Sequence, residues 1–412
     1  MTEKADRDKI RRQNRSVLLQ ALRRIGAQAR IDLGRETRLS PATVTSITSD
    51  LISEGIVTGI EDPEQKTRAT RGRPRALLSL DGGAARVLAV KLSVNKIEFA
   101  LADYAGAVLA RGGAGFASET TTASSFGETL VKAARGFLDG IAGGVRPSII
   151  SIAAQGIVDD SAGTVAWSPA FSERHVPVVA PMEAAFGVPC RLSNDTNMIA
   201  EALHQVDPER YGGTFAVIFI DYGVGMGLFV DNRLFVGETG AAAEIGHANH
   251  IPGGALCRCG RRGCLEAYLG DYAIKRVALG LDPQTQPARV DEETATIPDL
   301  VHAAEAGNRG AREAFSSAGT ALGYALARLS ATLDPRRIAV TGGAMPAWPL
   351  LAPAVEAALR EALVDDLQPR AAIDPIDWEE DLVLRGTLAR GLHELDTRVF
   401  AEQAGSGLAL HE

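Results

Sequence analysis

The chain has 412 residues, of which 46% are hydrophobic and 23% are charged, with a formal net charge of −8. This composition is that of a globular protein with a buried core, and it excludes a wholly disordered chain. The length predicts two or three domains, because domains commonly contain about 100 to 200 residues. The chain lacks an apolar run of about 18 residues and begins with charged residues rather than a signal peptide, so we expect a cytoplasmic protein.

The two ends of the chain carry opposite charge. Residues 1–80 contain 16 Lys and Arg against 10 Asp and Glu, which is a net charge of +6. The net charge of −8 for the whole chain therefore leaves −14 for residues 81–412. A small basic module on a large acidic body is typical of a protein that meets DNA phosphates with one end only. A basic face that contacts only solvent produces the same charge pattern.

The first 80 residues have the pattern of a helix-turn-helix domain. Apolar residues recur at helical spacing over 10–25, and a second short helix is predicted over 31–37. A third helix is predicted to begin after Ser40, because Ser40 is an N-cap residue and Pro41 follows it at the first helical position. This third helix is expected to end at Gly55.

The third helix has the composition of a DNA-recognition helix. Val44, Ile47 and Leu51 are spaced by three and four residues and predict its buried face. The other faces carry small and hydroxyl side chains, which can approach base edges in the major groove. A helical hairpin with no role in DNA binding shows the same pattern. The expected DNA contacts from this part of the chain are Ser40, Ala42, Thr43, Thr45 and Ser46.

Two short strands, over 56–60 and Ala76–Leu80, are predicted to flank a polar loop and to add a wing to the helices. The loop contains the sequence Arg-Gly-Arg-Pro-Arg, in which Gly and Pro favour an extended chain between arginines. Such a segment suits a narrow minor groove, although a basic linker has the same composition. Together with the helices, the wing favours a winged helix-turn-helix. The expected DNA contacts of the loop are Arg71, Arg73 and Arg75.

Residues 81–412 are predicted to form an α/β body of two lobes. Strand-like runs over 86–90, 97–103, 149–152, 215–220 and 338–340 are separated by helical stretches. Turn residues separate the first two runs, which predicts a hairpin.

A group of cysteines and histidine carries the clearest chemistry in the body. Cys257, Cys259 and Cys264 lie within eight consecutive positions shortly after His247, whereas the fourth cysteine stands apart. Three thiolates and one imidazole complete a tetrahedral Zn²⁺ site with no open position for a catalytic water. We therefore expect a structural zinc. His250 is a rival fourth ligand, because spacing does not separate it from His247.

Four motifs of this chain resemble those of the ROK family, named for repressors, open reading frames and sugar kinases. They lie in the family order at 194–197, 220–228, 244–247 and 257–266. The helix-turn-helix and the Gly-Arg-Pro segment resemble the repressor branch of the family. The resemblance implies a winged helix-turn-helix over 1–80, followed by the lobes 81–198 and 199–412 of an actin-like ATPase or sugar-kinase fold. It also implies that a C-terminal helix returns to the first lobe.

The resemblance further implies a sugar site. Carboxylates and amides suit this task, because they form hydrogen bonds with sugar hydroxyls. Asp195 falls at the position of the family's catalytic base, and we interpret it as a sugar contact. The implied sugar-binding residues are Gly156, Ser168, Asn194, Asp195, Glu244, His247 and Glu266.

The segment 91–95 departs from the kinases of this fold. It reads Lys-Leu-Ser-Val-Asn where they have Asp-x-Gly-Gly-Thr, so a carboxylate and two glycines that meet ATP phosphates are missing. We therefore expect no enzymatic activity. The expected function is a homodimeric or homotetrameric regulator that represses carbohydrate uptake or catabolism genes and leaves double-stranded operator DNA when a sugar or sugar derivative binds. A working ATP-dependent sugar kinase and a repressor controlled by a partner protein are the alternatives.

Overall fold

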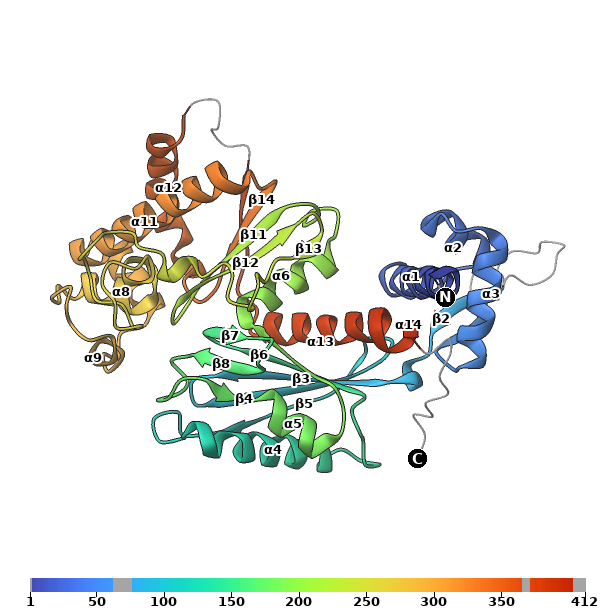
Figure 1. Ribbon diagram of the computed structural model, residues 1–412. Helices are drawn as coiled ribbons and strands as arrows, with labels where there is room; N and C mark the ends of the chain where they lie inside the picture. Colours follow the sequence, from blue (N-terminus) through green and yellow to red (C-terminus); the bar gives the residue numbers. More distant parts are fainter. Residues whose placement is uncertain (1, 62–75, 365–370, 403–412) are drawn as a thin grey trace.

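The computed structural model describes residues 2–61, 76–364 and 371–402 of the chain. An N-terminal domain lies beside an α/β body of two lobes (Figure 1). Helix α13 (Leu382–Glu394) lies between the lobes and extends toward the N-terminal domain. The mixed α/β fold agrees with the prediction from sequence. None of the described helices is long and apolar enough to span a membrane.

The N-terminal domain has three helices and a two-stranded antiparallel sheet, as predicted. Its first helix begins at Thr2 rather than at residue 10, because residues 2–9 are mostly polar and charged and carry no apolar periodicity. Ser40 caps the third helix, and its Oγ accepts a hydrogen bond from the Thr43 amide at 3.1 Å. The elements are α1 (Thr2–Ile25), α2 (Arg30–Thr37), α3 (Pro41–Ser53), β1 (Val57–Glu61) and β2 (Ala76–Leu80).

The first lobe is built on a five-stranded mixed sheet in the order β10-β6-β3-β4-β5. Helices α4 and α5 cover one face of this sheet, and α13 packs on the other. The predicted hairpin is present, because β3 and β4 pair in antiparallel register. The main elements are β3 (Arg86–Ser93), β4 (Lys96–Asp103), β5 (Val108–Gly115), α4 (Ala123–Asp139), β6 (Ile149–Ala154), α5 (Val179–Phe186) and β10 (Cys190–Asn194). A smaller sheet contains β7 (Ile157–Asp159), β8 (Thr164–Trp167) and β9 (Val176–Pro177), and the short η2 (Gly82–Ala84) precedes β3.

The second lobe has a sheet in the order β13-β12-β11-β14-β15, with α6 on one face and α11 and α12 on the other. Its strands are β11 (Phe215–Ile220), β12 (Val224–Val230), β13 (Arg233–Leu234), β14 (Arg337–Thr341) and β15 (Ala372–Pro375). Its larger helices are α6 (Asp195–Val206), α8 (Asp271–Ala278), α10 (Ile297–Glu305), α11 (Arg309–Leu333) and α12 (Trp348–Ala362). Short helices are η3 (Ile245–His247), α7 (Glu266–Leu269), α9 (Pro287–Asp291) and η4 (Met345–Ala347).

One hydrophobic cluster joins the N-terminal domain to the body. It contains Leu22 of α1, Leu51 of α3, Val87 of β3 and Leu392 of α13. After α13 the chain continues as the π-helix η6 (Leu395–Val399) and the short α14 (Phe400–Glu402), both of which pack against α1. A shared core of this kind holds the N-terminal domain against the first lobe, because separating the two would expose apolar surface to water.

Helices α6 and α13 pack with their backbones in close contact. A Cβ atom on Gly386 of α13 would lie only 1.7 Å from the carbonyl oxygen of Met198 in α6. Any residue larger than glycine at this position would push the two helices apart.

Candidate functional site

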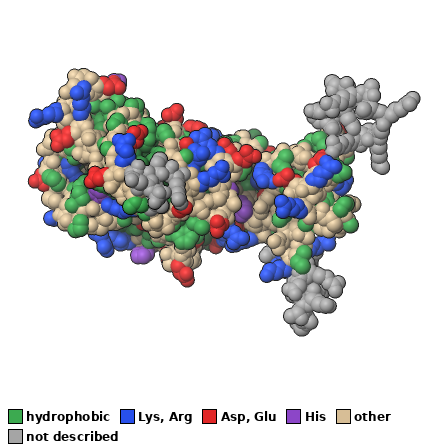
Figure 2. Space-filling model, turned by 90° about the horizontal axis from the view of Figure 1, so that it is seen from above, with side chains coloured by type: hydrophobic (Ala, Val, Ile, Leu, Met, Phe, Trp, Pro, Cys, Tyr) green, Lys and Arg blue, Asp and Glu red, His purple; other side chains and the backbone are tan. Residues whose placement is uncertain are grey.

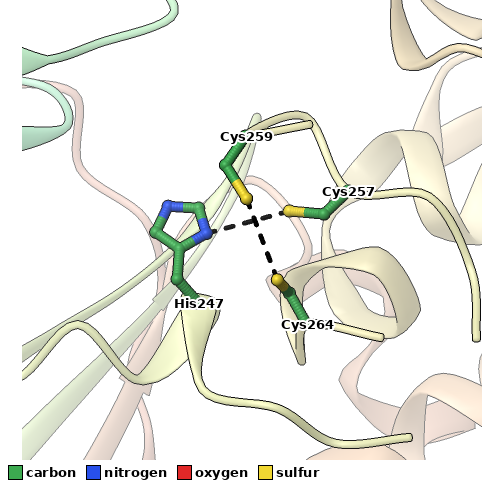
Figure 3. A group of neighbouring side chains, drawn as sticks. All are labelled: His247, Cys257, Cys259 and Cys264. Atoms are coloured by element: carbon green, nitrogen blue, oxygen red, sulfur yellow. Dashed lines mark hydrogen bonds between the residues drawn. The ribbon is translucent and has the colours of Figure 1, made fainter. Parts of the chain in front are cut away.

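The predicted metal ligands lie together in the second lobe (Figure 3). His247 ends η3, and the three cysteines come from the loop that precedes α7. The His247 Nδ1 atom is 3.7 Å from the Cys257 sulfur, and the Cys259 and Cys264 sulfurs are 3.8 Å apart. All four ligand atoms lie within 4.8 Å of one another.

Two glycines allow the cysteine loop to turn back on itself. Gly260 and Gly263 have φ angles of 85° and 82°, in the left-handed region that favours glycine. A Cβ atom on Gly263 would lie 1.8 Å from the carbonyl oxygen of Ile251. Replacing Gly263 by any other residue would therefore displace the loop that carries the ligands.

The geometry of the cluster fits a tetrahedral metal ion. Zinc–sulfur bonds of about 2.3 Å imply ligand atoms about 3.8 Å apart in a tetrahedron, which is close to the two short distances observed. A hydrogen bond with Cys257 lowers the pKa of the Cys259 thiol, which favours the thiolate form that binds metal ions. His250 is not part of the cluster, because its Nδ1 atom faces the Arg328 guanidinium at 3.4 Å.

A polar pocket lies between the lobes, next to the metal cluster. Asn194, at the end of β10, caps α6 by accepting hydrogen bonds from the amides of Thr196 and Asn197. Its side-chain nitrogen donates to the Gly156 carbonyl at 2.8 Å, which connects the start of α6 to the first lobe. Gly156 has a φ of 101°, and a Cβ atom there would lie 2.3 Å from the Trp167 carbonyl oxygen.

Two carboxyl groups of this pocket have raised pKa values. Burial raises the pKa of Asp195 to about 6 and that of Glu244 to about 7. Glu244 therefore keeps its proton to higher pH than an exposed glutamate does, and a protonated carboxyl can both donate and accept hydrogen bonds. The Lys91 ammonium acts in the opposite direction on Asp195, because its charge favours the carboxylate.

The structure brings six of the seven predicted sugar residues to this pocket, and the exception is Ser168. The Ser168 side chain is 2% exposed, and its Oγ accepts a hydrogen bond from the Ala170 amide at 3.0 Å. Ser168 thus stabilises the turn behind Gly156 and lies outside the lining. The predicted residues that line the pocket are Gly156, Asn194, Asp195, Glu244, His247 and Glu266.

Sequence reasoning missed Arg258, which also lines the pocket. Its guanidinium lies 3.7 Å from the ring centroid of Tyr222 and 4.6 Å from that of Tyr272. It also forms an ion pair with Asp291 at 2.6 Å. The available signal was its position between two metal ligands, Cys257 and Cys259. The pocket therefore combines carboxylates with a fixed, stacked cation.

The turn between β3 and β4 differs from a phosphate-binding loop. The Lys91 ammonium lies 3.1 Å from the Glu98 carboxylate. The Asn95 amide donates to Ser118 Oγ at 2.7 Å, and Asn95 Oδ1 accepts from the Ser118 amide at 3.0 Å. The backbone amide of Asn95 is therefore already hydrogen-bonded within the protein.

The predicted DNA contacts of α3 lie at the surface of the N-terminal domain. Val44, Ile47 and Leu51 are buried, as predicted, which turns the hydroxyl-rich side outward. Figure 2 shows basic side chains on this domain, with acidic and apolar ones among them. Of the predicted contacts, Thr43 is half-buried, and the exposed ones are Ser40, Ala42, Thr45 and Ser46. The three predicted wing contacts lie outside the described residues: Arg71, Arg73 and Arg75.

Solved structures share this fold. The chain superimposes on a ROK family transcriptional regulator, described as a homologue of the E. coli MLC protein, with a TM-score of 0.79 and 24% identity, covering 95% of this chain and 99% of that one. A ROK family glucokinase from Streptomyces griseus, solved with glucose and AMPPNP, has a TM-score of 0.59 and 26% identity, but covers only 74% of this chain and 99% of its own.

Sequence comparisons agree with the structural ones. The DNA-binding transcriptional dual regulator NagC of Escherichia coli K12 is 26% identical over 399 residues, which cover 94% of this chain and 97% of NagC. The DNA-binding transcriptional repressor Mlc of the same organism is 24% identical, with 93% and 92% covered. The protein-family model described as "ROK family" matches residues 87–389. This chain therefore belongs to the ROK family.

Proposed function

We propose that this chain is a DNA-binding transcriptional regulator that responds to a sugar and represses genes of carbohydrate uptake or catabolism. One observation carries the proposal: an exposed helix-turn-helix and a carboxylate-lined pocket are joined by α6, α13 and one continuous core. The relatives NagC and Mlc, which are named as transcriptional regulators, align over nearly the whole chain, including the N-terminal domain. We assign 1–80 to DNA binding and the two lobes of 81–412 to sensing, and we place the boundary between the lobes at the start of α6 rather than after residue 198, because α6 packs on the second-lobe sheet.

The N-terminal domain would read double-stranded operator DNA with α3 in the major groove. The exposed Ser40, Thr45 and Ser46 stand on the side of α3 that faces away from the core. Paired helix-turn-helix domains reach half-sites about 34 to 36 Å apart, so the active assembly is a homodimer or a homotetramer. A regulator of this kind acts where the DNA is, in the cytoplasm.

The pocket between the lobes would bind the sugar. Its carboxylates, the Asn194 amide and the Arg258 guanidinium suit a ligand with several hydroxyl groups. The space open to water in the pocket is about 50 Å³, which is room for only a few water molecules. A hexose therefore requires the lobes to separate slightly, and sugar binding favours a different arrangement of the lobes.

The cluster of three cysteines and His247 would hold a structural zinc. Its four ligands are close enough to surround the ion, and Cys257 and Cys264 are buried. When bound, the zinc supplies a fixed cross-link and no open coordination position. The same segment carries His247 and Glu266 into the pocket, so the cluster sets the positions of two sugar contacts.

The signal would travel from the pocket to DNA through two helices. Asn194 and Asp195 stand at the start of α6, which packs against α13. Beyond α13, the buried Asp396 accepts hydrogen bonds from Nε and Nη2 of Arg23 in α1, at 2.7 and 2.8 Å. The Tyr104 hydroxyl donates to the same carboxylate at 2.6 Å. A change in the arrangement of the lobes therefore moves the DNA-binding domain and alters the distance between the recognition helices α3 of the two subunits.

A screen of sugars tests the proposal against its alternatives. The zinc-loaded full chain is titrated with a panel of hexoses and amino sugars in a thermal-shift assay, alone and with operator DNA selected from a random pool. We expect at least one sugar to stabilise the protein and to release the DNA. ATP turnover with any sugar would instead favour a kinase. Release of DNA by a partner protein, without any sugar-induced shift, would favour control by that partner.

A further inference from the structure

We propose that a second cavity between the lobes binds a phosphate group through Arg191, Arg390 and Arg398. This cavity has a volume of about 410 Å³, which exceeds the space that a few water molecules need. It adjoins the sugar pocket, since Asn194 lines both. Its walls come from the first lobe, from α6, β13 and the segment after β13 in the second lobe, and from α13 with η6.

The charges in this cavity favour an anion. Three arginines face two carboxylates, those of Asp160 and Glu394. Glu394 already has two partners, because its Oε1 atom lies 2.9 Å from Arg191 and 3.0 Å from Arg398. Arg390 stands one helical turn before Glu394, yet within the described chain no carboxylate forms an ion pair with it.

A residue with a buried amide, Asn197, is among those that line this cavity. Asn197 is 2% exposed, and its Oδ1 atom has no hydrogen-bond partner among the described residues. Buried polar groups are nearly always hydrogen-bonded, so this side chain indicates a missing partner. The oxygen and nitrogen of an amide are assigned from their neighbours, and the same side chain can present its NH₂ group to an anion.

Phosphate is the anion that this arrangement suits best. Its oxygens accept hydrogen bonds from several guanidinium groups at once, with the planar geometry that arginine offers. The phosphate group belongs either to inorganic phosphate or to a phosphorylated sugar. In both cases it competes with Glu394 for Arg191 and Arg398.

This competition would connect the cavity to the DNA-binding domain. Glu394 ends α13, and Asp396, two residues later, holds Arg23 of α1. Freeing Glu394 therefore loosens the end of α13 that contacts α1. This regulatory consequence rests on the proposed function, whereas phosphate binding itself does not.

Calorimetric titration of the zinc-loaded full chain with inorganic phosphate tests the site. Arg390→Gln is expected to weaken binding about 10-fold or more, since it removes hydrogen bonds to a charged ligand. Glu394→Gln is expected to tighten binding by a similar factor, because it removes the competing carboxylate. Arg385→Gln, on the same helix but bonded to Glu379 outside the cavity, should leave affinity unchanged. A general loss of stability cannot explain opposite changes in phosphate affinity in Arg390→Gln and Glu394→Gln.

Further arms separate the sources of the phosphate and the possible failures. Arg398→Gln gives a second test if Arg390→Gln does not fold, since the Arg398 side chain is 65% exposed. If glucose 6-phosphate binds at least 10-fold more tightly than inorganic phosphate, and Glu244→Gln loses this gain in affinity, the source of the phosphate group is a sugar phosphate. Equal affinities for the two ligands identify inorganic phosphate as the source. No saturable binding at millimolar phosphate, or equal affinity in Arg390→Gln and wild type, overturns the site. Phosphate binding without any sugar response would overturn the proposed function alone.

Discussion

Removing the Asp396 carboxylate is expected to loosen the N-terminal domain from the lobes. Asp396 is fully buried and accepts three hydrogen bonds, two from Arg23 and one from Tyr104. Asp396→Ala leaves the Arg23 guanidinium, whose side chain is 11% exposed, without its counter-charge. Removing one partner of a buried ion pair costs about 3 to 5 kcal/mol. We expect the lower value, about 3 kcal/mol, because Arg23 retains its contact with the Tyr104 carbonyl.

Hydrogen exchange of the α1 amides measures this effect locally. A loss of about 3 kcal/mol corresponds to about 100-fold faster exchange, at about 1.4 kcal/mol for each factor of ten. The matched control is Asp50→Ala, which breaks an exposed ion pair between Arg11 of α1 and α3. An exposed pair contributes about 0 to 1 kcal/mol, so this variant should change exchange little. Unchanged exchange in Asp396→Ala, or equal acceleration in both variants, would refute the reasoning.

Three further predictions concern the pocket, the helix contact and the metal. Burial raises the pKa of Asp195 to about 6 from 3.8, so its stabilising contribution is present below pH 3.8 and is lost as the pH rises through 6. In urea unfolding at pH 7, Asp195→Asn should therefore be more stable than wild type by up to about 3 kcal/mol, whereas at pH 4 the two proteins should be equally stable. The same stability difference at both pH values would contradict this prediction. Gly386→Ala should lower the free energy of unfolding by about 1 to 3 kcal/mol, because α6 obstructs the added methyl group. The control Gly136→Ala, which has open space around it, should raise the free energy of unfolding slightly. Equal effects of the two substitutions would argue against the close helix contact. Metal analysis should find one zinc per chain in wild type and in His250→Ala, and none in Cys259→Ser. Loss of zinc in His250→Ala would identify His250, rather than His247, as the fourth ligand.

Local signals in the sequence predicted the elements of the N-terminal domain. Ser40 followed by Pro41 marks the start of α3, because both residues act on the backbone next to them. Residues 56–60 and Ala76–Leu80 predicted the wing strands, and β1 and β2 pair there. The pocket was predicted differently, by resemblance to a family, since its residues come from segments far apart in the chain.

Long-range contacts could not be predicted from the sequence. Arg23 and Asp396 are separated by 373 positions, and no local pattern pairs one arginine with one of many carboxylates. Arg258 was missed for a similar reason, because stacking on Tyr222 depends on how two loops meet. Ser168 is adjacent in sequence to pocket residues, but its hydroxyl turns back to the local backbone.

Titration of operator DNA with and without sugar tests the central claim most directly. Wild type should lose operator affinity about 5- to 150-fold when the best sugar of the panel is present, and operator should weaken sugar binding by the same factor. Glu244→Gln should bind operator like wild type and lose the response to sugar, because Glu244 lines the pocket between the lobes and is not part of the N-terminal domain. Release of DNA from Glu244→Gln at the wild-type sugar concentration would contradict the assigned pocket, and an unchanged operator affinity of wild type with every sugar would contradict the account itself.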